Sequence, residues 1–159
     1  MEIAEYRNKL YRIVQIENEL FLMSRGKKEE EFTPAIGING KVIDGLYEKK
    51  VKEEELEDAY EFGYEAYYKG EKFDTASVED LWNEGNIRLD TENIDFVEKY
   101  EFEVMDRSWF YKRVKAEEIE ALIEYKVPIL QFENTKQMTS RKIPKEEIMD
   151  YAKYMASFA

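Results

Sequence analysis

Basic and aromatic side chains interleave in the segment from Arg107 to Lys115, which reads Arg-Ser-Trp-Phe-Tyr-Lys-Arg-Val-Lys. On a strand, Trp109, Tyr111 and Arg113 would share one face, because side chains alternate between the two faces. Flat rings beside a guanidinium group can stack nucleobases and hold phosphates. The segment therefore predicts a binding or sequestering site for a small nucleotide-like ligand. The alternative is a core strand whose rings pack inward while its basic groups pair with neighbouring glutamates.

Four carboxylates recur at helical spacing in the segment 52–69. If this segment is a helix, Glu54, Asp58, Glu61 and Glu65 form one face of it, opposite an apolar face. Four like charges at this spacing repel one another unless salt or a partner screens them. Such a row could imitate nucleic-acid phosphates and occupy a basic groove of another protein. The alternative is a solvated face of an acidic protein.

The same segment carries four tyrosines, at positions 60, 64, 67 and 68, which are too many for a single core face. We therefore expect Tyr64 or Tyr68 to lie exposed and to anchor the partner, because exposed tyrosines are enriched at protein interfaces. The spacing Ala59-x-x-x-Gly63 would also let another helix approach closely, which leaves a homo-oligomer open.

The chain contains no His and no Cys. Thiolate nucleophiles, Ser-His-Asp relays and zinc sites built on those residues are therefore absent. The stretch Gly37-Ile38-Asn39-Gly40-Lys41 lacks the spacing of a phosphate-binding loop, and Asp90, Glu92 and Asp95 lack the pattern of a calcium loop. With no way to select two catalytic carboxylates, we expect a non-enzymatic protein without cofactor or metal.

Charge is distributed unevenly along the chain, whose net charge is −12. Residues 1–106 carry a surplus of acidic groups, whereas residues 107–145 are locally basic. A chain of this charge is repelled by a nucleic-acid duplex, so direct duplex binding is disfavoured and a basic protein partner is favoured. The leading hypothesis is an inhibitor that covers the nucleic-acid-binding surface of a host enzyme by charge imitation. In size and charge the chain is similar to small phage proteins that act against restriction or CRISPR effectors.

The first residues, Met1 to Arg7, contain no apolar run and predict no signal peptide. The longest apolar runs have four residues, far fewer than a membrane span needs. We therefore expect a cytoplasmic protein that does not enter a membrane.

The elements that must position these side chains are predicted to be mixed. The apolar spacing indicates helices over 3–14, 52–69 and 116–125, short helices after Ser77 and Thr91, and a closing helix after Pro144. Residues 10–23 are consistent with either a helix or a β-hairpin. Strands are expected around the turn Asn39-Gly40, over 109–114, and over 127–132 and 137–142.

Mixed helices and short strands without a βαβ rhythm are typical of an α+β fold. We expect one compact domain over 1–159 with short antiparallel strands or hairpins and about four to six helices. The shift in charge leaves open an acidic subdomain, 1–99, and a subdomain of mixed charge, 100–159.

Overall fold

Tight turns with left-handed backbone join successive strands of this chain. A computed structural model describes residues 1–159. Arg7 and Asn8, with φ of 51° and 60°, connect the strands Glu2–Tyr6 (β1) and Lys9–Ile16 (β2). Positive φ at both central residues is the signature of the turn whose twist matches two antiparallel strands. The chain therefore doubles back from its first residues onward.

Half of the residues lie in strands and a fifth in helices. Besides β1 and β2, the strands are β3 (Glu19–Arg25), β4 (Thr33–Ile36), β5 (Val42–Val51), β6 (Asp58–Tyr68), β7 (Glu71–Thr75), β8 (Asn86–Thr91), β9 (Glu103–Val104), β10 (Phe110–Lys115), β11 (Ile119–Pro128) and β12 (Thr139–Pro144). The α-helices are α1 (Glu79–Asn83), α2 (Asp95–Tyr100) and α3 (Ile148–Ala156). Short 3-10 turns lie at Glu53–Glu55, Ala116–Glu118, Leu130–Phe132 and Lys145–Glu147.

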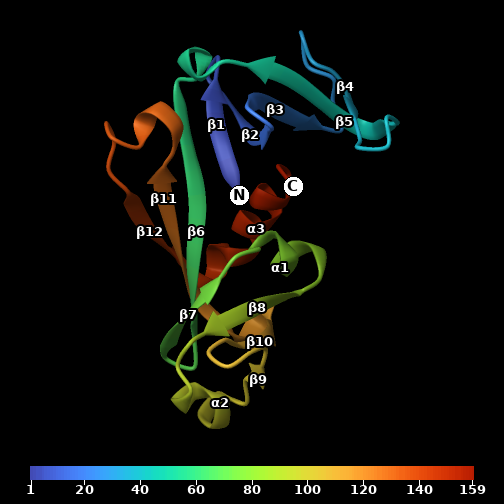
Figure 1. Cartoon of the computed structure of the whole chain (residues 1–159). Helices are drawn as coiled ribbons and strands as arrows, with labels where there is room; N and C mark the ends of the chain where they lie inside the picture. The colour runs from blue at the N-terminus through green and yellow to red at the C-terminus, as the bar shows by residue number, and fades with distance from the viewer. The chain divides into compact units, whose positions relative to one another are not determined.

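The expected α+β fold with four to six helices is wrong. The fold is a largely antiparallel β-structure of 12 strands with only three short α-helices (Figure 1). The predicted helix 52–69 is the strand β6, in which Tyr60, Phe62, Tyr64, Ala66 and Tyr68 are all buried. This period of two, in a segment rich in aromatic residues, outweighs the helical spacing of its other apolar positions.

Two further predicted helices are strands. The segment 3–14 lies in β1 and β2, and residues 10–23 form the hairpin of β2 and β3, which was the alternative to a helix. The segment 116–125 is mostly β11, and Lys69-Gly70 is a hairpin turn between β6 and β7, where the sequence suggested the end of a helix. In each case partner strands complete backbone hydrogen bonds that local spacing does not reveal.

Other local predictions are confirmed. The turn around Asn39-Gly40 joins the antiparallel strands β4 and β5, and Gly40 has a φ of 73°. Residues 109–114 lie almost entirely in β10, and short helices follow Ser77 and Thr91 as α1 and α2. The closing helix is α3, and its buried residues are Ile148, Tyr151, Ala152 and Met155.

The chain divides into two compact units, which are described separately. Unit 1 comprises residues 1–62, 126–139 and 157–159, and unit 2 comprises residues 63–125 and 140–156. The strands β6 and β11 pass through both units. The predicted single domain, and the alternative division at residue 99, stay predictions.

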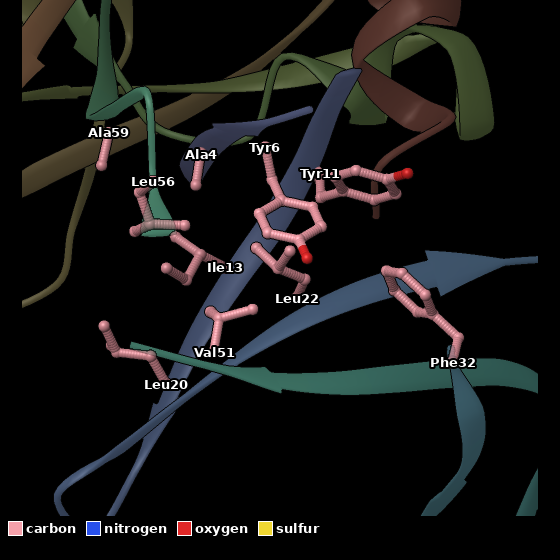
Figure 2. Packing of buried hydrophobic residues seen from close by; sticks show 10 residues of the cluster. All are labelled: Ala4, Tyr6, Tyr11, Ile13, Leu20, Leu22, Phe32, Val51, Leu56 and Ala59. Carbon is pink, nitrogen blue, oxygen red and sulfur yellow. The ribbon is translucent and has the colours of Figure 1, made fainter. Parts of the chain in front are cut away.

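Unit 1 is built from the antiparallel neighbours β4, β5, β3, β2, β1 and the first part of β6. Figure 2 shows its core, in which the rings of Tyr11 and Phe32 lie 5.3 Å apart and Leu22 packs nearby. The remaining members of this cluster are Ala4, Tyr6, Ile13, Leu20, Val51, Leu56 and Ala59. The alternation of side chains along β2 and β3 places Tyr11, Ile13, Leu20 and Leu22 on one face.

Unit 2 is built from the second part of β6 followed by β7, β8, β10 and β9. The short helices α1 and α3 pack against each other in this unit (Figure 1). Ile87 and Leu89 of β8 are fully buried, whereas the residues between and beside them are partly exposed. One face of the strands β8 and β10 is therefore free to carry polar side chains.

No helix of the chain combines the length and the hydropathy that a membrane-spanning segment needs. The cytoplasmic location stays a prediction.

Candidate ligand-binding site

The strands β8 and β10 place a set of charged and aromatic side chains on one face of unit 2. In their antiparallel register, Tyr111 is opposite Asp90 and Arg113 is opposite Arg88. Directly opposed residues of an antiparallel pair project from the same face, and so do residues two apart on one strand. These four side chains therefore share one face, and the turn before β10 adds Trp109 to it.

A pocket of about 420 Å³ opens on this face. Its walls come from the segment after β7, from α1, from β8, and from β10 together with the residue that precedes it. The lining residues are Ala76, Ser77, Asp80, Arg88, Asp90, Trp109 and Arg113. This volume lies in the range of small-molecule sites, which combine a flat apolar wall with a few polar groups. Two of the three residues predicted for a ligand, Trp109 and Arg113, thus line one pocket.

The indole ring of Trp109 is held in place at the pocket wall. Its Nε1 donates a hydrogen bond of 2.9 Å to Asp90 Oδ1. The turn before it is closed by the Ser108 amide, which donates to Asp106 Oδ1, and the backbone amide of Met105 donates to the Trp109 carbonyl. A ring with a fixed orientation can stack a planar ligand without losing further conformational entropy.

The two arginines of the pocket differ in how firmly they are bound. Arg88 donates to Asp90 Oδ1 from both Nε, at 2.8 Å, and Nη2, at 2.6 Å, and its guanidinium lies 4.9 Å from the ring centre of Tyr111. Arg113 uses only Nη1, which donates to Glu84 Oε2 at 3.1 Å and to Asn86 Oδ1 at 2.7 Å. Like charges opposite each other on neighbouring strands are unfavourable, and these carboxylates compensate for that.

The negative charge of the pocket comes from Asp80 and Asp90. Burial raises the pKa of Asp80, nearby Glu84 raises it further, and Arg113 opposes both effects. With the two arginines and the two aspartates ionised, the lining of the pocket has no net charge. Such a pocket offers donors for one anionic group and acceptors for the N–H groups of a ring.

Tyr111 was predicted to contact the ligand, but it does not line the pocket. It lies beside the Arg88 guanidinium, and its hydroxyl donates to Glu103 on the neighbouring strand β9. The hydrogen bond to that carboxylate raises the pKa of Tyr111. Tyr111 therefore contacts the Arg88 guanidinium with its ring instead of lining the pocket.

The four carboxylates predicted to form an acidic stripe do not share one face. Glu54 lies in a 3-10 turn, and the other three lie on β6, where Asp58 projects opposite to Glu61 and Glu65 because of strand alternation. Asp58 pairs with Lys136 at 2.9 Å, whereas Glu61 is exposed.

Glu65, in unit 2, is also engaged. It pairs with Lys72 at 3.6 Å and accepts a hydrogen bond from Tyr125, which raises the pKa of that tyrosine to about 12. Asp58 and Glu65 are thus paired with lysines, and the predicted helix 52–69 that would align all four carboxylates is absent.

The prediction that Tyr64 or Tyr68 is exposed is wrong, because both alternate into the buried side of β6 with exposed fractions of 5% and 2%. The Tyr64 and Tyr151 hydroxyls lie 2.9 Å apart, and Tyr151 donates to the buried carboxylate of Glu124. Burial raises the pKa of both tyrosines. Arg141 completes the network from β12 with a bond of 3.1 Å to Glu124.

Sequence reasoning missed Arg88, Asp90 and Asp80 as pocket residues. Arg88 and Asp90 alternate with buried Ile87 and Leu89, which is the pattern of a half-exposed strand. That pattern could have identified β8, but it could not have shown that β10 is its neighbour. No cluster of three or more carboxylates has the arrangement of a cation site.

Residues 2–132 match the model of a protein family described as "Uncharacterised conserved protein UCP033725". The match covers most of the chain, so the chain belongs to this family. No curated protein and no solved structure matches it.

Proposed function

We propose that this chain is a non-enzymatic binding protein that holds a small ligand in the pocket of unit 2. The ligand carries a planar ring, which stacks on Trp109, and an anionic group, which Arg113 binds. The observation that carries the proposal is the convergence of a fixed indole ring and two guanidinium groups on one pocket of about 420 Å³. Stacking of a base on an aromatic side chain contributes about 1–3 kcal/mol, enough for selective binding when a charged contact is added.

Charge imitation of nucleic acid stays a prediction that rests on the net charge of −12. Its proposed carrier, a helical row of Glu54, Asp58, Glu61 and Glu65, is not formed. The exposed tyrosines that were to anchor the partner are buried. The pocket is therefore the better supported of the two proposals.

The test uses the whole chain with Trp82→Phe, which leaves Trp109 as the only tryptophan. Nucleosides and their monophosphates are titrated while Trp109 fluorescence and the thermal midpoint are recorded. We expect quenching of Trp109 and a midpoint that rises with ligand concentration, because a ligand that binds only the folded state stabilises it.

Arg113→Ala should weaken binding of the monophosphate by about tenfold or more, since it removes a charge-assisted hydrogen bond. Arg107→Ala is the matched control, because it removes the same charge from an exposed position of the same segment outside the pocket. The proposal is wrong if no compound changes fluorescence or stability, or if the two arginine variants behave alike.

A further inference from the structure

We infer that Glu84 competes with the ligand for Arg113, and that the ligand therefore carries one anionic group on its planar ring, as a phosphate monoester or a carboxylate. This inference rests on the proposed function and names the ligand class and its internal competitor. Three observations support it. The two arginines of the pocket differ in exposure and in the number of hydrogen bonds to their carboxylate partners, Glu84 is exposed, and two aspartates line the pocket wall.

Arg88 is held by hydrogen bonds to other side chains of the protein. Two of its nitrogens donate to one oxygen of Asp90, whose side chain is only 13% exposed, and Nη2 also lies 3.1 Å from the sulfur of Met105. The same Asp90 oxygen accepts the indole N–H of Trp109. Displacing Asp90 would leave three donors without their acceptor, so a ligand anion gains little by approaching Arg88.

Arg113 can exchange its partner Glu84 for an anionic group of a ligand. Its side chain is 50% exposed, its ion-pair partner Glu84 is 52% exposed, and the pair is made by a single nitrogen. Exposed ion pairs of this kind contribute little to stability, because solvent screens both charges. An anion that reaches both outer nitrogens of Arg113 forms a two-point contact, which is stronger than the single contact with Glu84.

The backbone around Glu84 lets its side chain leave without disturbing the fold. Glu84 is the C-cap residue of α1, and its backbone amide donates a hydrogen bond of 2.7 Å to the Asp80 carbonyl. Gly85 follows with a φ of 72°. Asn86 keeps its own bond of 2.7 Å to Arg113 when Glu84 moves away. The guanidinium therefore stays oriented at the pocket while its carboxylate partner is replaced.

The two aspartates limit the charge that the pocket accepts. Asp80 and Asp90 both line it, and Arg113 is the only exchangeable cation among the lining residues. A ligand with a triphosphate would bring several negative charges close to these carboxylates, and like charges in a site select against such a ligand. A single phosphate monoester or carboxylate satisfies Arg113 without this repulsion.

The experiment compares four probes on the whole chain carrying Trp82→Phe: adenosine, adenosine monophosphate, adenosine triphosphate and indole-3-acetate. Affinities are measured by isothermal titration calorimetry at constant ionic strength, because indole-3-acetate fluoresces like Trp109. We expect the monophosphate to bind at least about fivefold more tightly than the nucleoside and more tightly than the triphosphate. Indole-3-acetate distinguishes a carboxylate ligand from a phosphate ligand.

Glu84→Gln should tighten binding of the anionic probes by about two- to fivefold and leave the nucleoside unchanged, because the nucleoside does not compete for Arg113. Glu79→Gln is the matched control, since Glu79 carries the same charge at the start of α1, whose C-cap is Glu84, and the ion pair of Arg113 is with Glu84. Equal tightening in both variants, or tightest binding of the triphosphate, would overturn the inference. If Arg113→Ala weakens binding of the monophosphate as expected while Glu84→Gln changes nothing, the proposed function stands and this inference fails.

Discussion

Two carboxylates of unit 1 have lowered pKa values, and two carboxylates of unit 2 have raised ones. In unit 1, a hydrogen bond from Lys9 lowers the pKa of Glu29, and one from Lys49 lowers that of Glu31. In unit 2, burial raises the pKa of Asp80, and burial and then Glu65 raise that of Asp74. These lysines of unit 1 therefore stabilise ionised carboxylates, whereas unit 2 holds carboxylates that would gain from a cation or a proton.

The recesses of the two units also differ in the side chains that line them. Two recesses of unit 1 have volumes of about 360 and 250 Å³, and no aromatic side chain lines either of them. The smaller contains the ion pair of Lys50 and Glu19. The pocket of unit 2 adds a fixed indole ring and an exchangeable arginine to its charges. Charged side chains line all three of these recesses. The aromatic ring of Trp109 distinguishes the pocket of unit 2 from the two recesses of unit 1.

The largest expected effect concerns the buried carboxylate of unit 2. Arg141→Met should lower the free energy of unfolding by about 1–3 kcal/mol, because Glu124, which is only 3% exposed, loses its cation. The cost stays below that of a fully buried pair because the Arg141 side chain is 61% exposed. Urea denaturation measures the change.

Arg7→Met is the counterpart in unit 1, where both partners of the pair with Glu31 are exposed. We expect a loss of less than about 1 kcal/mol from this variant. Equal losses in the two units would remove the distinction between surface pairing and compensation of a buried charge.

The next effect concerns the pocket. Asp90→Asn should weaken binding of the uncharged nucleoside adenosine by about tenfold, because an amide oxygen is a poorer acceptor for Trp109 than a carboxylate and the ring loses its fixed orientation. Titration of Trp109 fluorescence in the chain with Trp82→Phe measures the affinity. Lys50→Met, in a recess of unit 1, should leave the affinity unchanged. An equal effect of both variants would show that the ligand does not distinguish the two regions.

The smallest effect is the pH dependence of stability. The raised pKa of Asp80 means that its ionisation costs stability at neutral pH, a cost that disappears as the pH falls below its ordinary value of 3.8. Asp80→Asn should therefore raise the thermal midpoint near pH 7 and not in acid.

For Glu31, the lowered pKa gives stability that is present above the ordinary value of 4.5 and is lost as the pH falls through the folded value. Glu31→Gln should lower the midpoint near pH 7, and this loss should vanish in acid. Thermal unfolding followed by circular dichroism from about pH 3 to about pH 8 measures both differences. Shifts of the same sign in both variants would contradict the comparison of the two units.

Local features of the sequence predicted part of this fold. The turn at Asn39-Gly40 and the closing helix α3 depend on residues close in sequence, and both are confirmed. The helix predicted over 52–69 failed because two apolar periods overlap there, and only the neighbouring strands β1 and β7 provide the hydrogen bonds that select the strand. Tyr64 and Tyr68 were misplaced for the same reason, since a change of period reassigns each side chain to a face.

The sequence by itself determined that Tyr111 and Arg113 share a face, that His and Cys chemistry is absent, and that the chain is acidic. Only the tertiary structure decided that Arg88 and Asp90 lie beside Trp109 and that Glu84 holds Arg113. These residues lie roughly twenty to thirty positions apart, and strand pairing over such distances depends on the whole sheet rather than on local spacing.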